Sequence, residues 1–241
     1  MIPKIIHYCW FGKKDKPVEV CQYIERWKSR LLDYQIIEWN EDNFDITYNK
    51  YVAEAYENRK FAFVSDVSRL YALYNFGGIY LDTDIEIMKS FDDILETSDL
   101  ILGFENGGQH IMTAFIAASR ENAIIKEFSE YYTNRSFILE NGQFDISPNT
   151  DEITKIISRL GGIMNNTMQK LASNVYVYPE EYFSAFEFKT FSKISTEHTY
   201  TVHHFHASWL PKYVRVRFKL KKIVIKIIGK DSFLRIKRLL N

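Results

Sequence analysis

Two aspartates separated by one residue, Asp82 and Asp84, are the side chains of this sequence best suited to metal chemistry. They follow the apolar run 79–81, which we expect to be a buried strand, and side chains two apart on a strand point to the same side. Two carboxylates held together repel each other unless a cation lies between them. Their oxygens suit a hard divalent ion such as Mg²⁺ or Mn²⁺, which commonly keeps places for substrate phosphates. The sequence therefore predicts a metal site at the carboxyl end of a strand, able to hold a nucleotide diphosphate.

A helix must precede this strand. Apolar side chains recur at helical spacing over residues 64–74, and Gly77–Gly78 then provide a stop, because glycine adopts left-handed backbone angles without strain. We expect Ser65 to cap the start of the helix and Asp66 to lie in its first turn, where the helix dipole favours an acid. Arg69 follows one turn later and can pair with Asp66.

Apolar runs alternate with amphipathic stretches from the beginning of the chain. This alternation predicts an α/β protein with parallel strands in a sheet and helices on its faces. No internal repeat or low-complexity linker interrupts it, so we expect one domain over residues 1–211 followed by a tail over residues 212–241. Strands are expected at 2–10, 34–39, 79–81, 85–88, 99–105, 175–178 and 199–205. Helices are expected to begin at residue 17 and to cover 50–58, 122–134 and 152–160. Residues 111–118 could be either a strand or a short helix.

Composition indicates a globular protein. The 241 residues are 46% hydrophobic and 16% aromatic, enough for a full core. Cys9 and Cys21 are too few for a disulfide framework and lack metal-ligand spacing, so we expect buried thiols in a reducing compartment. No signal-peptide-like or membrane-spanning run occurs, which favours a cytoplasmic location.

The net charge of zero conceals an asymmetry. Residues 212–241 carry eleven Lys and Arg but one acid, so the remaining body is acidic. A basic amphipathic segment can lie on an anionic membrane surface, which would place the protein at the inner face of the cell membrane. The same segment could instead be a helix packed on the acidic body. Nucleic-acid binding is not expected, because no aromatic platform or recognised motif accompanies the basic run.

Three stretches together resemble the pattern of glycosyltransferase family 32. They are residues 2–12 (IPKIIHYCWFG), residues 65–71 (SDVSRLY) and residues 77–84 (GGIYLDTD), and residues 203–209 (HHFHASW) are similar to the closing His-His-x-x-x-Ser-Trp of that family. The family includes yeast initiating mannosyltransferases and bacterial capsule and lipopolysaccharide enzymes. The spacing is also similar to that of the glucosyltransferase domain of large clostridial toxins. The resemblance is dense over residues 1–105, and the tail lies outside it.

The resemblance implies a GT-A-type fold, a mixed Rossmann-like sheet flanked by helices. It further implies a nucleotide-sugar donor, Mn²⁺ or Mg²⁺, and transfer with retention of configuration. Asp82 would contact the ribose and the metal, and Asp84 would ligate the metal. His203 is the closing-motif histidine favoured to complete the metal or diphosphate shell, with Ser208 and Trp209 nearby. His203 and His204 should point opposite ways on a strand, so at most one faces the ion.

The remaining site residues are also implied by the resemblance. Trp10 would stack on the nucleobase, and Tyr80 would pack near the nucleoside, although strand packing alone also explains Tyr80. Asp66 and Arg69 would hold the sugar hydroxyls and the sugar–phosphate region, with Arg69 stabilising charge on the leaving diphosphate. Asn149 lies in a proline-containing loop expected near the donor sugar.

The resemblance thus implies a hexosyltransferase that uses a nucleotide sugar, with UDP favoured and GDP-mannose as an alternative. The acceptor would be a glycan or lipid-linked saccharide in surface polysaccharide or capsule synthesis. Two rivals stay open: a non-catalytic module of the same fold that binds nucleotide sugars or glycans, and a metal-dependent phosphotransferase or nuclease. Glu105, at a strand end, could orient an acceptor or be a surface acid, and His7 and His110 look like ordinary polar positions.

Overall fold

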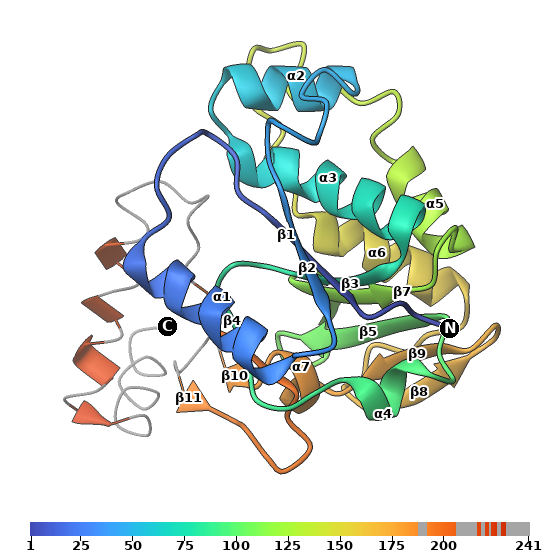
Figure 1. Cartoon of the computed structure of the whole chain (residues 1–241). Coiled ribbons are helices and arrows are strands. Elements are labelled where there is room, and N and C mark those ends of the chain that lie inside the picture. Colours follow the sequence, from blue (N-terminus) through green and yellow to red (C-terminus); the bar gives the residue numbers. More distant parts are fainter. Residues whose placement is uncertain (188–191, 206–215, 218–219, 222, 226–227, 230–241) are drawn as a thin grey trace, which may run out of the picture.

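A mixed sheet with helices on both faces forms the body of the protein (Figure 1). The computed structural model describes residues 1–187, 192–205, 216–217, 220–221, 223–225 and 228–229. Within them, the main path of the sheet runs β2–β1–β3–β7–β5–β9–β8, and β6 pairs with β5. These strands are β1 (Ile5–Cys9), β2 (Gln35–Trp39), β3 (Gly78–Leu81), β5 (Leu100–Glu105), β6 (His110–Ile111), β7 (Phe115–Ala118), β8 (Gln169–Leu171) and β9 (Val175–Tyr178).

Parallel pairing holds for only part of the sheet. β1 is parallel to both β2 and β3, and β5 is parallel to β9, whereas β7 is antiparallel to β3 and β5. The predicted mixed sheet flanked by helices is confirmed. Two further pairs lie beside it: β4 (Ile85–Ile87) with β12 (Thr201–His203), and β10 (Phe186–Glu187) with β11 (Ser192–Lys193).

Helices cover each face of the sheet through its own hydrophobic core (Figure 1). Successive side chains on β3 show the division, because Tyr80 belongs to one core while Ile79 and Leu81 belong to the other. On the Tyr80 side lie α2 (Lys50–Glu57), α3 (Phe61–Phe76), α5 (Ala123–Glu130) and α6 (Asn149–Arg159), and on the other side lie α1 (Val18–Arg30), α4 (Asp92–Leu95) and α7 (Glu180–Phe183).

The predicted start of α3 is wrong. The helix begins at Phe61, so Ser65 is inside it and its hydroxyl donates to the Phe61 carbonyl at 3.0 Å instead of capping the end. Asp66 therefore lies in the second turn, away from the first-turn position that an N-terminal dipole would favour. Phe63 and Val64, which are buried in the core, extend the helix beyond the polar signal that suggested a cap.

Two glycines form the junction between α3 and β3. Gly77 ends the helix with φ at 65°, and Gly78 has φ at 109°. A Cβ on Gly78 would lie 2.6 Å from the Ile5 carbonyl oxygen, so the close approach of β1 requires glycine there. His7 secures the same junction, because its Nε2 donates to the Gly77 carbonyl at 2.8 Å and its Nδ1 accepts from Trp39 Nε1 at 3.1 Å.

His7 is thus not the ordinary polar position that the sequence suggested. It is fully buried, and burial lowers the pKa of its imidazole to about 4. A neutral ring with a proton on Nε2 satisfies both hydrogen bonds.

Other boundaries differ in smaller ways. Residues 110–118 form two strands and not a helix, and α6 begins at Asn149, three residues before the expected start. None of the described helices is long and apolar enough to cross a bilayer. The predicted boundary at residue 211 and most of the predicted tail lie outside the described residues.

Candidate active site

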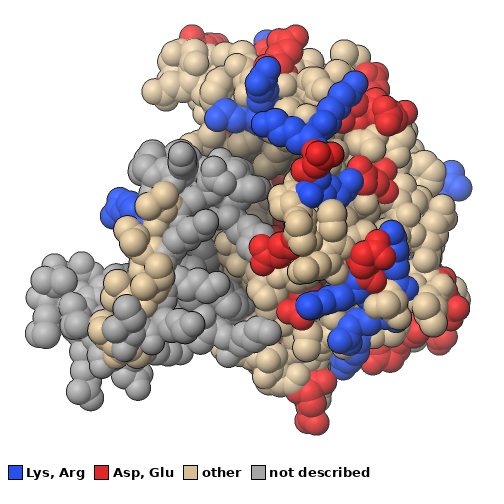
Figure 2. Space-filling view, turned by 60° about the vertical axis from the view of Figure 1, so that its left-hand side comes forward, with Lys and Arg blue, Asp and Glu red and all other residues tan. Residues whose placement is uncertain are grey.

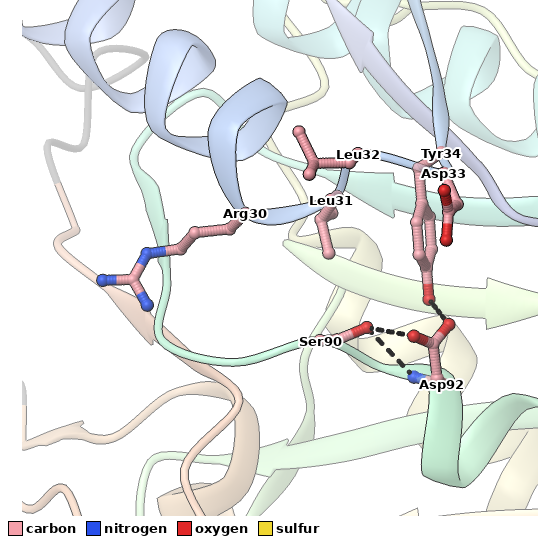
Figure 3. A pocket seen from close by; sticks show the side chains of 7 residues that line it. All are labelled: Arg30, Leu31, Leu32, Asp33, Tyr34, Ser90 and Asp92. Atoms are coloured by element: carbon pink, nitrogen blue, oxygen red, sulfur yellow. Dashed lines mark hydrogen bonds between the residues drawn. The ribbon is translucent and has the colours of Figure 1, made fainter.

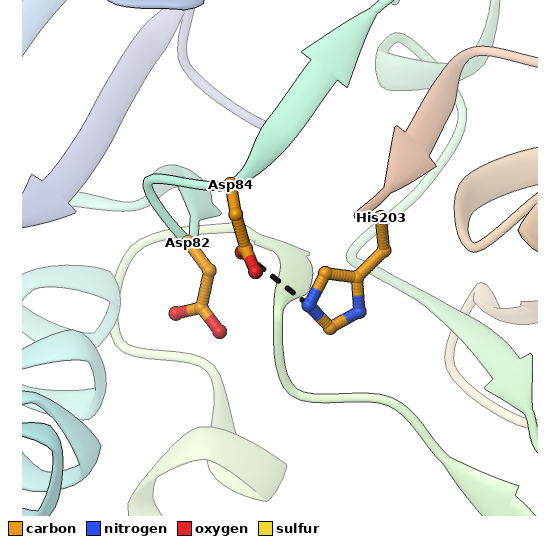
Figure 4. A group of neighbouring side chains, drawn as sticks. All are labelled: Asp82, Asp84 and His203. Atoms are coloured by element: carbon orange, nitrogen blue, oxygen red, sulfur yellow. Dashed lines mark ion pairs between the residues drawn. The ribbon is translucent and has the colours of Figure 1, made fainter. Parts of the chain in front are cut away.

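The side chains of Asp82 and Asp84 lie close to that of His203, which comes from a distant part of the chain (Figure 4). One ligand atom from each residue lies within 4.8 Å of the other two, and His203 Nε2 is 3.4 Å from Asp84 Oδ1. The side chains are largely covered, with 31% of Asp82, 14% of Asp84 and 11% of His203 exposed. Residues more than a hundred positions apart in sequence therefore converge on one point.

A turn, and not strand alternation, makes the two aspartates converge. β3 ends at Leu81, and the Ile85 amide donates to the Asp82 carbonyl at 3.1 Å, which closes a turn over residues 82–85. The chain then leaves the main sheet and continues as β4, which pairs antiparallel with β12 and aligns His203 with Ile85. The prediction that both acids face one way holds, but its stated reason was wrong.

The donor set fits a divalent cation. Two carboxylate oxygens and one imidazole nitrogen are ligands that Mn²⁺ accepts, and carboxylates also suit Mg²⁺. Burial lowers the pKa of the His203 imidazole, but Asp84, Asp82 and Glu105 outweigh burial and raise the pKa above its ordinary value. The site therefore attracts positive charge, as a metal site must.

Arg69 lies behind this point, enclosed by the protein. Only 4% of the residue is exposed, and its Nη1 donates to the Thr113 carbonyl at 2.7 Å. Its Nη2 lies 2.9 Å from Asp66 Oδ1 and 3.4 Å from Asp82 Oδ1. The guanidinium carbon also lies 4.4 Å from the centre of the Tyr80 ring. Arg69 thus links the two predicted acids, Asp66 and Asp82, within the fold.

Asp66 accepts a second bond from the start of α6. Asn149 Nδ2 donates to Asp66 Oδ1 at 2.8 Å, and the Thr113 hydroxyl donates to Asn149 Oδ1 at 2.9 Å. Burial raises the pKa of the Asp66 carboxyl to about 7, while Arg69 acts in the opposite direction. The structure thus brings Asn149, which is distant in sequence, to the neighbouring pair Asp66 and Arg69. We call these three residues, together with Thr113 and Tyr80, the Arg69 network.

Tyr80 has a different position from the one expected. It is 1% exposed, and its hydroxyl donates to Asp82 Oδ1 at 2.8 Å. A ring covered on one face by Arg69 and buried in the core offers no surface to a nucleoside. The nucleoside contact is therefore corrected to a supporting contact, in which Tyr80 holds Asp82.

Trp10 directly follows β1 at the edge of the sheet where β3 ends. The parallel register pairs His7 with Tyr80, so Trp10 lies at the level of the Asp82–Asp84 turn. Its ring is partly exposed, its Nε1 donates to the Lys14 carbonyl at 2.6 Å, and Lys16 Nζ lies 5.9 Å from the ring centre. A partly exposed aromatic ring beside a cation is a suitable surface for a base, and the base contact stays a prediction.

Sequence reasoning missed some contributors and could not place others. Thr113 contacts both Arg69 and Asn149, but a threonine between apolar residues carries no signal in one sequence. Burial raises the pKa of the Glu105 carboxyl to about 7. Asp82 and Glu180 act in the same direction, and His203 acts against it. Ser208 and Trp209 lie outside the described residues.

A cavity of about 190 Å³ lies elsewhere, where α1 ends and β2 begins (Figure 3). Arg30, Tyr34 and Asp92 are among its lining residues, and Tyr34 donates to Asp92 across it at 2.9 Å. β1, β2 and β3 are parallel, so the start of β2 and the end of β3 lie at opposite edges of the sheet. None of the predicted site residues lines this cavity.

Residues 17–101 match the family model described as "Glycosyltransferase sugar-binding region containing DXD motif". This range contains Asp66, Arg69, Tyr80 and both aspartates of the turn. Over this range the chain is similar to the DXD-containing glycosyltransferases. The resemblance predicted from the sequence is confirmed.

The chain is also similar to individual glycosyltransferases. "Inositol phosphoceramide mannosyltransferase 1" of Schizosaccharomyces pombe is 26% identical over 119 residues, which cover 42% of this chain and 34% of the yeast protein. The chain thus matches about a third of the length of that relative. PaToxG glycosyltransferase overlaps 66% of this chain and 68% of its own, with a TM-score of 0.49 and 17% identity. A glycosyltransferase involved in glycosylation of the major capsid of PBCV-1 overlaps 90% and 100%, with a TM-score of 0.48 and 9% identity.

Proposed function

We propose that this protein is a retaining, metal-dependent glycosyltransferase that moves a hexose from a nucleotide sugar to a glycan or lipid-linked acceptor. The observation that carries the proposal is the convergence of Asp82, Asp84 and His203 in a chain that has the DXD sugar-binding region. An isolated acid pair is common on protein surfaces. Here the acid pair lies beside a buried histidine from a distant strand and beside the Arg69 network. Such an arrangement is typical of a binding site.

In this proposal Asp82, Asp84 and His203 hold Mn²⁺ or Mg²⁺, which supplies positive charge that stabilises the leaving diphosphate. Trp10 provides the base surface at the same edge of the sheet. Arg69 is enclosed by its contacts with Asp66, Asp82 and Thr113, which supports an indirect role for it instead of a contact with the leaving diphosphate. Its role is to keep Asp82 and Asp66 in place as charge develops, which preorganises the site electrostatically.

Asp66 and Asn149 are proposed to contact the sugar of the donor. Asp66 Oδ1 is occupied by Arg69 and Asn149, and its side chain is 15% exposed. A carboxylate held by two donors has a defined direction, so it can accept a hydrogen bond from a sugar hydroxyl without reorganising. Glu105 is proposed to face the acceptor side.

The donor is proposed to be a UDP-hexose, with GDP-mannose as the alternative. The resemblance to family 32 favours UDP slightly, whereas the yeast relative is named a mannosyltransferase. Retention of configuration likewise rests on the family resemblance. Synthesis of a surface polysaccharide or capsule is the proposed setting.

The proposed location is the inner face of the cell membrane, through the basic tail. Described apolar side chains of the tail recur at helical spacing and are 37% to 57% exposed, namely Val216, Leu220, Ile223, Val224 and Ile228. Basic residues lie between them in the sequence, a composition typical of segments that bind anionic lipid. The described surface in the view of Figure 2 carries both signs of charge rather than a purely acidic face. Sedimentation with anionic vesicles should be lost when residues 212–241 are deleted.

A panel of nucleotide sugars tests the proposed reaction. The protein is mixed with UDP- and GDP-hexoses in Mn²⁺ or in EDTA, and both donor hydrolysis and thermal stability are measured. One donor should be hydrolysed only with metal, and at a hundredfold excess over its dissociation constant it should add about 2.7 kcal/mol to the stability. Metal-dependent binding without hydrolysis or transfer would favour the non-catalytic module. No response to any donor would refute the proposal.

A further inference from the structure

The direction of the His203 ring is not set by the hydrogen bond that usually orients a metal-binding histidine. Such a histidine commonly donates its second ring nitrogen to a carboxylate, a carbonyl or a water. His203 directs Nε2 toward Asp84, but its Nδ1 is buried and has no hydrogen-bond partner among the described residues. Its orientation must therefore come from packing and from the strand that carries it.

The main chain around His203 is tied directly to the aspartate turn. The His204 amide donates to the Asp84 carbonyl at 3.1 Å, and the His203 amide donates to the Ser184 carbonyl at 2.9 Å. In the β4–β12 pair, His203 is opposite Ile85 and Val202 is opposite Glu86. Any movement of β12 against β4 would therefore change the distance between His203 and Asp84.

Side chains on the other side of this pair hold it to α1. Glu86, two residues after Asp84, has Oε2 3.0 Å from His204 Nε2 and Oε1 3.2 Å from Arg26 Nη1. The His204 ring also stacks on Tyr23 of α1, with ring centres 5.3 Å apart. We call Arg26, Glu86 and His204 the clamp. It joins one helix and both strands of the pair through a single carboxylate.

Helix α1, which carries Arg26 of the clamp, is itself attached firmly to the segment around β4. Trp27 of α1 is fully buried, and its Nε1 donates to the Ile85 carbonyl at 2.9 Å. Arg30, one turn later, donates to the Met88 carbonyl. β4 is thus attached to α1 on either side of Glu86, so a carboxylate at Glu86 can transmit that fixed position to His204.

We propose that Glu86 is a positioning residue of the metal site, which fixes the direction of His203 by holding His204 to α1. The inference rests on the metal site of the proposed function. It assigns a task to the second histidine of the closing pair, which faces away from the ion, and to an acid that is not one of the ligands. Glu86 acts through the neighbouring residue and does not touch the metal.

Mn²⁺ affinity, measured from the free Mn²⁺ signal by electron paramagnetic resonance, tests the clamp without requiring turnover. Glu86→Ala should weaken Mn²⁺ binding about tenfold, the usual lower effect of losing a supporting partner. Glu86→Gln keeps an oxygen acceptor without the charge and should recover part of the loss. Glu25→Ala is the matched control, because Glu25 is an acid on the exposed side of α1 that pairs only with nearby Lys28 among the described contacts.

A background variant separates positioning from simple charge attraction. In His203→Ala, the further change Glu86→Ala should cause no additional loss of Mn²⁺ affinity, because the residue that Glu86 positions is gone. An equal loss in both backgrounds would mean that the negative charge of Glu86 acts on the ion through space, and would overturn the inference. So would a folded Glu86→Ala with wild-type affinity.

The outcomes also separate this inference from the proposed function. If the wild type binds no Mn²⁺, the metal site itself is refuted and the clamp falls with it. If the wild type binds and Glu86→Ala binds equally well, only the clamp is refuted. Should Glu86→Ala not fold, Arg26→Ala removes the clamp from its exposed end, where Arg26 is 55% exposed, and should weaken binding by a smaller factor.

Discussion

Two groups of acidic side chains meet at Asp82 and differ in how their charge is compensated. In the Arg69 network, the cation is part of the chain, and Asp66 and Asp82 both contact the same buried guanidinium. In the group of Asp82, Asp84 and His203, three ligand atoms converge within 4.8 Å, as around a divalent ion. The first group is a scaffold that exists with the fold. The second presents donors, and it is the group that we propose to bind a ligand.

Asp82 belongs to both groups and serves a different purpose in each. Asp82 takes one contact from Arg69 and one from Tyr80, and both use Oδ1. Its direction is thereby set before any ion binds. A rigid carboxylate costs less entropy on binding than a mobile one. Four experiments test whether the two groups differ in this way.

The largest effect is expected from Arg69→Ala. Removal of the buried cation leaves Asp66 in a covered site without its ion-pair partner, and we expect a loss of roughly 3 to 5 kcal/mol in the free energy of unfolding. Urea denaturation measures it. Arg120→Ala, which breaks an exposed pair with Glu121, should cost less than about 1 kcal/mol. Similar small losses for both variants would show that the Arg69 network is not a scaffold. Arg69→Lys serves if the alanine variant does not fold.

Asp84→Asn should weaken Mn²⁺ binding strongly and change the free energy of unfolding little. It removes a ligand from the second group while leaving the Arg69 network intact, so most of the stability without metal should remain. Mn²⁺ affinity should fall more than about 100-fold, beyond the range for supporting residues. That corresponds to about 2.8 kcal/mol of binding free energy. Titration with Mn²⁺ measures the affinity, and Asp42→Asn, a change at an exposed acid, is the control. Unchanged affinity in Asp84→Asn would remove the second group from metal binding.

Acidification should weaken the junction from which both groups extend. The unfolded chain protonates His7 near pH 6.5, whereas burial keeps the pKa of His7 in the folded protein at about 4. Between these values the unfolded state binds the extra proton, so stability falls as pH falls from 6.5 toward 4. At pH 5 the His7 contribution should be a loss of about 2 kcal/mol relative to pH 7.

The His7 effect is measured as a difference between proteins. His7→Gln should show a shallower fall in stability between pH 7 and pH 5 than the wild type, while His198→Gln, a change at an exposed histidine, should keep the wild-type slope. Equal slopes in all three proteins would argue against a buried neutral His7.

The smallest effect is expected from Tyr80→Phe. The variant keeps the ring against Arg69 but loses the hydroxyl that donates to Asp82, which should cost about 1 kcal/mol of stability. Mn²⁺ affinity should fall by less than about tenfold. The partly exposed Tyr48 provides the matched control as Tyr48→Phe. A Tyr80→Phe protein with normal Mn²⁺ affinity and normal stability would show that Asp82 needs no support from this side.

Local patterns in the sequence determined the parts of this protein that depend on neighbouring residues. The α/β alternation, the glycine stop, the acid pair and the closing histidine pair could all be predicted, because periodicity and backbone preference act over a few residues. The convergence of the two aspartates was also predicted, although a turn and not a strand produces it. The start of α3 was misplaced because burial of Phe63 and Val64 outweighed the local capping signal.

Tertiary structure alone decided what each functional side chain touches. Pairing of β4 with β12 places His203, and not His204, beside Asp82 and Asp84 and directs His204 to Glu86. Thr113, between β6 and β7, contacts Arg69 of α3 and Asn149 of α6, and Asn149 reaches Asp66 across 83 positions of sequence. These contacts are made by chain segments that are distant in sequence, so no local preference encodes them. Only the packing of the sheet against its helices brings them to one place.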